Sequence, residues 1–582
     1  MAVYYSVGEY LSDQLLDLLL RTYGAWRIVG MLVCGLCASG VFHVFLWPCM
    51  SWIGRYLKFL FPTGGRTADS GPLPKFEDYL PPNGRGRVTL TLVRAKKQPV
   101  PNDHWLPLSN LDRVVNPTFS SVLLYFLAGE LKNAGDIAGK LKESLADVLS
   151  EFFPFAGRLE LRENGLVDLR CNNKGAIFQE AYVDEKLAPF GPLKPQPALS
   201  GLHSSFITKL KNKITQTKDL PGAYLPDQIE PMPVLIVQLT RFACGSVSLG
   251  VNWHHMVADG SAGCHFIKSW AETALGLNEV QKCMGEETLS GDLPRSRVDF
   301  ISEKPNHNRS LLNPRNPPDP SLVNRNGYST QVVPQNVISS EKKEWRPAMV
   351  QPFFISEEKV REVVEMVKEQ EATYPQYAVP KDRRQYTTAE CLSALLWRAF
   401  TRSRYASLAG PGEGRDPQTR FFMFVDGRAR SRLNLPKNYF GNVVCSACAI
   451  TTEKTLLSEP LIHAVYLLRN AVDGVNGPYF RSLIDWVETL GTNSNSTNSD
   501  HVNSRGQDVA ATFWNAFPLY RMDFGWGPPT FAARNSPPRE FIDGFAVMPS
   551  KTGNKDMVAL INLHEDRLER LLQEETFRAL IS

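Results

Sequence analysis

Apolar residues alternate with small or polar residues from Ser246 to Trp253. This alternation predicts a half-buried β-strand, in which successive side chains point to opposite faces. His255 continues the apolar phase of the strand, so we expect its side chain to start from the buried side. Asp259-Gly260-Ser261 then predicts a turn and a helix cap. A helix should follow, because apolar residues continue at helical spacing with Phe266, Ile267 and Trp270.

A second hydrophobic pattern lies near the N-terminus, where no charged residue occurs from Ile28 to Ile53 if His43 is neutral. As a helix this run would be about 39 Å long at ~1.5 Å per residue, which is enough to cross a hydrocarbon core of ~30 Å. Aromatic residues cluster towards its ends, as interfacial anchors do. We predict a membrane anchor within residues 1–61, with its transmembrane helix at about 28–53. An amphipathic or buried helix pair broken at Pro48 is the alternative.

Basic residues on the two sides of this segment bear on its orientation. Arg21 and Arg27 precede it, and three basic residues follow it: Arg55, Lys58 and Arg66. This slight positive-inside bias predicts a catalytic region that faces the cytosol, with the anchor in the endoplasmic reticulum membrane. Glycan on Asn308 or Asn495, which have the form of glycosylation acceptors, would contradict that topology. The stretch 62–87 is rich in proline and glycine and predicts a linker.

The rest of the chain has the length and composition of a globular protein with two large lobes. A total of 582 residues is too long for one ordinary core. Strand and helix signals alternate in both halves, which predicts an α/β fold. A net charge of +4 gives no reason to expect nucleic acid as a partner. The 10 cysteines form no regular disulfide framework, which fits a reducing compartment.

His255 is the first candidate for chemistry. Its side chain has an unperturbed pKa of ~6.5, which suits a general base that takes a proton from a hydroxyl or an amine. The alternative is a core histidine that is satisfied by a backbone group. A metal site with His254 and Asp259 is not expected, because zinc needs three or four clustered ligands and no further group offers one. We expect neither a metal nor a bound cofactor.

A second candidate is the segment Asp523-Phe524-Gly525-Trp526-Gly527. Its glycines lack backbone restriction, so the chain can turn sharply beside the large ring of Trp526. The ring could form a wall of an acyl site, or its N–H could stabilise a developing oxyanion. Asp523 lies in a mainly apolar stretch, so it should need a cationic partner.

His255-Met256-Val257-Ala258-Asp259 and Asp523–Gly527, in this order and at this separation, resemble the two signatures of the plant BAHD acyltransferases. The resemblance extends from about residue 88 to the C-terminus. Further blocks that are similar to the family follow in order: Leu106–Asp112, Phe152–Leu159, Cys171–Gly175, Phe178–Ala181, Leu396–Ala399, Val425–Arg430 and Tyr439–Asn442. Asn308–Leu312 is similar to the crossover of the hydroxycinnamoyl and benzoyl branch, which favours an aromatic acyl-CoA as the donor.

The resemblance implies a two-lobe fold like that of chloramphenicol acetyltransferase, with the active site in a tunnel between the lobes. It divides the chain into an N-terminal lobe (88–295), a crossover (296–340) and a C-terminal lobe (341–582). Acyl-CoA would enter as co-substrate from one face and the acceptor, an alcohol or an amine, from the other. The two would react directly in a ternary complex on what we expect to be a monomer.

The resemblance also assigns roles to residues. His255 would be the catalytic base. Asp523 is at times regarded as catalytic, but we favour a structural role in which it pairs with Arg428. The remaining residues expected to shape the site are these: Asp259, Gly260, Arg428, Trp526 and Gly527.

One departure concerns the acceptor. Shikimate hydroxycinnamoyltransferases carry an arginine seven residues before the aspartate of the second signature, where this chain has Ala516. Alanine cannot bind a carboxylate in a bidentate manner, so a neutral acceptor is expected unless an arginine from another loop substitutes. Two other functions stay open: amide synthesis from a carrier-bound acyl group, as in condensation domains, and a catalytically silent binding protein tethered to a membrane.

Overall fold

The computed structural model describes the chain from residue 86 onward, within one compact unit that spans 75–582. The gaps in the described part are 116, 132–134, 184–185, 187–231, 277–301, 324–347, 381, 383, 406–413, 415, 430–431, 492–507, 535–542 and 553–554. The predicted membrane helix at 28–53 and nearly all of the predicted linker lie outside the described residues. Among the helices that are described, none is long and apolar enough to cross a membrane.

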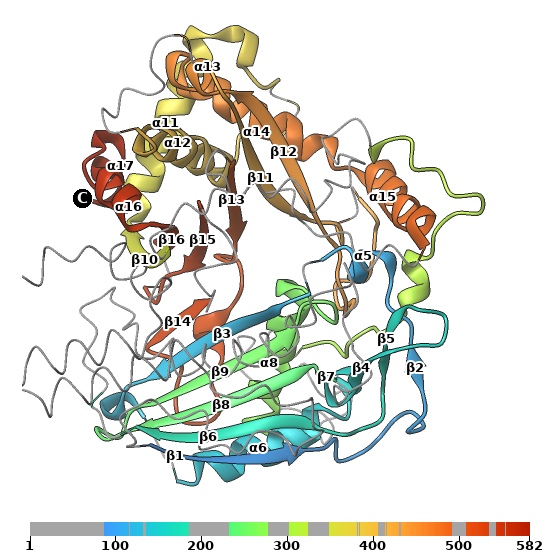
Figure 1. Ribbon diagram of the computed structural model, residues 1–582. Coiled ribbons are helices and arrows are strands. Elements are labelled where there is room, and N and C mark those ends of the chain that lie inside the picture. The colour runs from blue at the N-terminus through green and yellow to red at the C-terminus, as the bar shows by residue number, and fades with distance from the viewer. Residues whose placement is uncertain are drawn as a thin grey trace, which may run out of the picture. The chain divides into compact units, whose positions relative to one another are not determined.

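The first lobe contains a six-stranded sheet with the order β1-β6-β8-β9-β3-β14 (Figure 1). Its strands are β1 (Gly86–Val93), β6 (Ala176–Val183), β8 (Leu235–Phe242), β9 (Val247–His254), β3 (Phe119–Phe126) and β14 (Phe531–Arg534). Helices α6 (Ile137–Val148) and α8 (Gly260–Ala274) cover one face and share a hydrophobic core with it. Strand β9 and helix α8 confirm the strand and the helix predicted around His255.

Strand β14 joins this sheet from the far end of the chain. It pairs antiparallel with β3, so that Phe531 lies opposite Tyr125 and Arg534 lies opposite Val122. The range 341–582, predicted as the C-terminal lobe, thus supplies one strand to the sheet of the first lobe. After the crossover at 296–340, the chain therefore crosses to the first lobe for β14 and back to the second lobe for β15.

The second lobe contains another six-stranded sheet, with the order β10-β16-β15-β13-β11-β12. Its strands are β10 (Ala348–Ile355), β16 (Met557–His564), β15 (Gly544–Pro549), β13 (Asp508–Phe513), β11 (Gln418–Asp426) and β12 (Val444–Thr452). Helices pack on one face and build a second hydrophobic core there: α11 (Glu357–Thr373), α12 (Thr388–Ser403), α14 (Leu461–Gly474), α16 (Glu565–Leu571) and α17 (Glu575–Ile581). Helix α12 begins with a capping box formed by Thr387 and Glu390.

Two segments carry side chains from the second half of the chain to the first lobe. The connection between β11 and β12, residues 427–443, contacts the loop that follows β9. The crossover, described at 302–323, pairs with this connection through a bridge between Asn306 and Tyr439. Short elements complete the junction: α5 (Asn110–Arg113), α15 (Gly477–Leu490), the 3₁₀ turn η4 (Arg309–Leu312), and a small sheet of β2 (Trp105–Leu106), β5 (Val167–Arg170), β4 (Arg158–Leu161) and β7 (Met232–Pro233). Helix α13 (Glu453–Ser458) instead packs in the second lobe, where Leu456 joins its core.

Two mixed sheets, each covered by helices on one face, confirm the predicted α/β class. Side chains of both sheets and of the segment after β13 contribute to one continuous core, including Trp253, Leu560, Trp514 and Phe524. The site residues described below lie where this core meets the β11–β12 connection.

Candidate active site

His255 is the first residue after strand β9. Its backbone N–H donates to the carbonyl of Thr118 at 2.7 Å, which extends the pairing of β9 with β3 by one residue. The loop after it is closed by the indole of Trp253, which donates to the carbonyl of Ala258 at 3.0 Å. His254 is buried with its ring edge-to-face against Phe119, at 5.3 Å between centroids. His255 is only half-buried, so it is the ring of the pair that a substrate can reach.

Asn442 of the β11–β12 connection fixes the ring of His255. Its Oδ1 lies 3.0 Å from His255 Nδ1. Its Nδ2 donates to the carbonyl of His255 at 2.7 Å and to Asp112 Oδ1 at 2.8 Å, which sets the orientation of the amide. Because an amide oxygen accepts and cannot donate, His255 Nδ1 must carry the proton. The lone pair is then on Nε2, the nitrogen that can act as a base.

Asp112 holds Asn442 in place from the other side. It is fully buried and accepts hydrogen bonds from the backbone N–H groups of Ser109 at 2.9 Å and Asn442 at 2.8 Å. Arg309 of the crossover balances its charge, with Nε 2.9 Å from Asp112 Oδ2. The same guanidinium donates to the carbonyls of Phe440 and Val257. Arg309 therefore ties the histidine loop and the β11–β12 connection to Asp112.

Asp259 and Arg428 form a second, bidentate contact between the lobes. Arg428 Nη1 lies 2.9 Å from Asp259 Oδ2, and Nη2 lies 3.0 Å from Oδ1. Asp259 is fully buried, caps helix α8 by accepting from Ala262 N–H at 2.9 Å, and also accepts from Val443 N–H at 3.0 Å. Burial alone would raise the pKa of the Asp259 carboxyl, but the charge of Arg428 and these hydrogen bonds hold that pKa below its ordinary value.

Gly260 makes room for an indole ring at the start of helix α8. A Cβ placed there would lie 3.1 Å from Trp514 Cζ2 and 3.4 Å from Phe517 Cε2. Trp514 also packs against Trp253, with 6.5 Å between ring centroids. The sequence predicted that Gly260 shapes the site. In the structure, the space left by its missing side chain is occupied by the ring of Trp514.

The predicted pairing of Asp523 with Arg428 is wrong. Arg428 pairs with Asp259 and also contacts Asp426, whereas Asp523 Oδ1 accepts from the backbone N–H groups of Gly525 at 2.7 Å and Gly527 at 2.9 Å. Asp523 is only partly buried, and two backbone donors bind its carboxylate; among the described residues no ion pair to Asp523 is found. Both glycines have positive φ angles, 104° and 109°, that other residues rarely adopt. Asp523 therefore stabilises the turn formed by residues 523–527.

Trp526 lies in the core of the first lobe. Its ring stacks on Phe524 at 5.8 Å and meets Phe126 edge-to-face at 6.0 Å, and only 2% of the residue is exposed. Among the described residues, no hydrogen bond or ion pair joins Asp523 or Trp526 to His255. A catalytic role for Asp523 and a site-lining role for Trp526 stay predictions.

Three residues that hold the histidine were not predicted to do so: Asn442, Asp112 and Arg309. Each lies within a sequence block that resembles the family, so its position was noted without a role. The available signal was a polar or charged residue beside apolar ones in each block, because such residues need hydrogen-bond partners when they are buried. Within the described residues, no group of three or more His, Cys, Asp or Glu could hold a metal ion.

Comparison with known proteins identifies the family. The sequence model of the Transferase family matches residues 89–577. A hydroxycinnamoyltransferase of Narcissus pseudonarcissus is 31% identical and aligns over 83% of this chain and 98% of its own length. A shikimate O-hydroxycinnamoyltransferase of Nicotiana tabacum is 27% identical, over 79% and 92%. The anthranilate N-benzoyltransferase protein 1 of Dianthus caryophyllus is 29% identical, over 82% and 96%.

Solved structures show the same fold at low sequence identity. Vinorine synthase superposes with a TM-score of 0.54 at 17% identity, and covers 86% of this chain and 99% of its own. TRI101 of F. graminearum, in complex with coenzyme A and deoxynivalenol, gives a TM-score of 0.58 at 16% identity, with 82% and 99% covered.

The chain belongs to the Transferase family, the BAHD acyltransferases, as its two signatures had indicated. It is an acyl-CoA-dependent O- or N-acyltransferase, which transfers an acyl group from a coenzyme A thioester to a hydroxyl or an amine.

Replacing Asp523 tests its structural role. Asp523→Ala removes the acceptor of two backbone N–H groups, so we expect the variant to melt several degrees lower and to lose activity in step with folded protein. Thermal unfolding and turnover measured on the same samples check this. Asp319→Ala is the matched control, because Asp319 accepts from Ser321 N–H in a similar turn but is exposed. A variant with wild-type stability that loses turnover alone would make Asp523 catalytic.

Replacing Asn442 tests the positioning of His255. In Asn442→Ala the imidazole loses the acceptor that sets its tautomer, so kcat should fall by about 10- to 100-fold while KM for acyl-CoA changes little. Asn438→Ala is the control on the same connection, since Asn438 donates to the carbonyl of Lys304 instead. Steady-state kinetics of both variants give the answer. An unchanged kcat in Asn442→Ala would exclude the positioning role.

Proposed function

We propose that this chain transfers an aromatic acyl group, of the hydroxycinnamoyl or benzoyl type, with His255 as the general base. One observation carries the proposal: the contact between His255 Nδ1 and Asn442 Oδ1, which leaves the lone pair of the half-buried ring on Nε2. An imidazole in this tautomer can take a proton from an incoming hydroxyl or amine near neutral pH.

The reaction then needs no covalent enzyme intermediate. Nε2 takes the proton as the acceptor oxygen or nitrogen attacks the thioester carbonyl. The carbon–sulfur bond breaks, and the imidazolium returns the proton to the leaving thiolate. Asn442 accepts the Nδ1–H bond throughout and keeps the ring oriented. Both substrates must therefore be bound at once, in a ternary complex.

The choice of an aromatic donor rests on two supports. The crossover segment Asn308–Leu312 is similar to that of the hydroxycinnamoyl and benzoyl branch. Several relatives at comparable identity are named as hydroxycinnamoyltransferases or as a benzoyltransferase. One of these relatives is named as an O-acyltransferase and another as an N-acyltransferase.

We also propose that residues 28–53 anchor the enzyme in the membrane of the endoplasmic reticulum, with residues 88–582 in the cytosol. The support is the uncharged run of that length, its flanking aromatic residues and the slight excess of basic residues after it. A supply of acyl-CoA in the cytosol fits this orientation.

Removing the base tests the catalytic proposal. His255→Ala should lower acceptor-dependent release of free thiol by ~10² or more, because no group at that position can take the proton. Release is followed across a matrix of acyl-CoA donors and alcohol or amine acceptors. Thermal unfolding shows whether the variant is folded, which we expect because the ring is only half-buried. Activity near that of the wild type would defeat the mechanism.

Deleting the uncharged run tests the anchor. The full chain should stay with membranes after alkaline carbonate extraction, and a chain without residues 28–53 should not. Protease treatment of sealed vesicles should digest the catalytic region from outside. Glycan on Asn308 or Asn495 would place the enzyme in the lumen and overturn the orientation.

A further inference from the structure

Strand β1 forms an outer edge of the first sheet, at the end of the strand order opposite to β14 (Figure 1). Among the described strands, none pairs with its outer side. From Val88 to Val93 the strand contains neither a charged residue nor a proline, although such residues commonly protect a sheet edge against further contacts. The edge is therefore open to a partner.

Two leucines of β1 lie on the face of the sheet that lacks helices. Thr91 is paired with Phe178, whose ring belongs to the core on the helix side. Because successive side chains of a strand alternate, Leu90 and Leu92 lie on the opposite face. They are 50% and 54% exposed, and Leu92 lies opposite the partly buried Ile177. Three apolar side chains thus meet at this edge.

Basic side chains surround the C-terminal end of β1. Arg94, Lys97 and Lys174 are all exposed. Lys174 is held near the end of the strand because its neighbour Asn173 accepts from the backbone N–H of Ala95 at 2.8 Å. No carboxylate among the described residues forms an ion pair with any of the three basic side chains. The apolar edge is therefore followed by a cluster with a net positive charge.

This charge decides between the partners that such an edge can take. A second copy of the chain would pair its β1 antiparallel with this one. Since Arg87 precedes the apolar stretch and Arg94 follows it, such a pair would bring like charges together at both ends. An anionic lipid surface instead attracts them. The unpaired backbone groups of an edge strand cannot enter hydrocarbon, so β1 would lie at the level of the headgroups, where water satisfies them.

The position of β1 in the chain also favours a membrane. The proposed anchor ends at residue 53, and β1, the first described element after it, begins at Gly86. A flexible chain of about 30 residues spans roughly 30 Å on average. Such a tether keeps its far end near the lipid surface at a roughly millimolar effective concentration, so even a weak contact is populated.

We propose that β1 docks on the anionic cytosolic surface of the membrane in which the chain is anchored. Leu90 and Leu92 enter the boundary between headgroups and acyl chains, and Arg94, Lys97 and Lys174 bind lipid phosphates. The assignment rests on the proposed anchor and adds a second, reversible membrane contact to it.

Docking at β1 would also orient the active site. Strands β1 and β9 run in the same direction, because β6 and β8 are parallel and β1 and β9 are each antiparallel to one of them. His255 therefore lies at the same end of the sheet as the basic cluster. It lies three strands inward from β1, about 14 Å at ~4.8 Å per strand.

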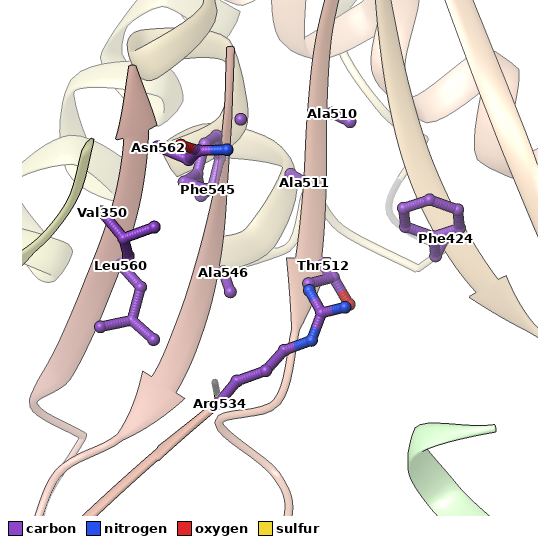
Figure 2. A pocket seen from close by; sticks show the side chains of 11 residues that line it. Val350, Phe424, Ala510, Ala511, Thr512, Arg534, Phe545, Ala546, Leu560 and Asn562 are labelled. Atoms are coloured by element: carbon purple, nitrogen blue, oxygen red, sulfur yellow. The ribbon is translucent and has the colours of Figure 1, made fainter. Parts of the chain in front are cut away.

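The second lobe supplies a matched control surface. Figure 2 shows Phe424 on the helix-free face of the second sheet, and Ile450 of the edge strand β12 lies on the same face. These two residues are 38% and 41% exposed. Arg420, which lies opposite Ile450, is bound by Asp508 at 2.6 Å. This apolar pair therefore lacks the net positive charge that accompanies β1.

Photocrosslinking of the full chain tests the docking. The chain is placed in phosphatidylcholine vesicles with about 30% phosphatidylserine, and benzoylphenylalanine replaces either Leu92 or Ile450. We expect about 10-fold more lipid adduct from position 92, and little difference in vesicles without phosphatidylserine. Equal labelling at the two positions would overturn the proposal. A dimer crosslinked through position 92 would overturn it as well, because it would assign the edge to a second copy.

Removing the basic cluster tests the charge. In the chain with benzoylphenylalanine at position 92, Arg94→Gln/Lys97→Gln/Lys174→Gln should lower the lipid adduct by about 10-fold. The matched control replaces three exposed lysines of the second lobe by glutamine: Lys368, Lys437 and Lys555. An equal loss in both triple variants would show attraction by net charge alone and would remove β1 as the docking site.

Failure of the docking and failure of the anchor give different results. A full chain that resists carbonate extraction but labels equally at both positions overturns the docking alone. If the chain is extracted, its flotation with the same vesicles at low salt decides. Flotation lost in Leu90→Asp/Leu92→Asp but kept in Ile450→Asp retains the docking and defeats the anchor, and no flotation defeats both. Turnover in detergent should be unchanged in these variants, since the three side chains are about half exposed.

Discussion

The buried ion pair between Asp259 and Arg428 is the constraint on which the site depends. Asp259 caps helix α8 and ends the histidine loop, and Arg428 belongs to the β11–β12 connection of the other lobe, 169 residues away. Arg428 also donates to the exposed carboxylate of Asp426 at 3.2 Å and to the carbonyls of Tyr439 and Gly441. Loss of Arg428 would leave the charge of Asp259 uncompensated in the core, a cost of about 3–5 kcal/mol. The ion pair thereby fixes the position of one lobe against the other.

The same packing of the two lobes also positions the ring of His255. Asn442 reaches the ring of His255 because the β11–β12 connection is held against the loop, in part by Arg428. Asp112 and Arg309 then lock Asn442 from the side of the first lobe and the crossover. A neutral amide contacts the ring where many hydrolases use a carboxylate, so the base stays in one tautomer without a neighbouring negative charge. His255 is therefore held in the tautomer that acts as a base only when the two lobes are packed together.

The two signatures of the chain have different physical tasks. The first carries His255 and the cap of helix α8. The second closes a turn on Asp523 and buries Trp526 in the core of the first lobe, after which the chain enters that lobe's sheet as β14. The turn thus contributes to the site by directing the chain, at a distance from the proton transfer.

The sequence by itself determined the strand and helix around His255, the α/β class and the family, because alternation, helical spacing and caps report local burial and turn chemistry. It also led to the family through motifs that lie within single segments. It did not reveal that Arg428 pairs with Asp259 and not with Asp523, that Asn442 holds His255, or that β14 crosses to the other sheet. These contacts join residues 169 and more positions apart. Only the packing of the two sheets selects such partners, since any buried carboxylate would fit the local pattern.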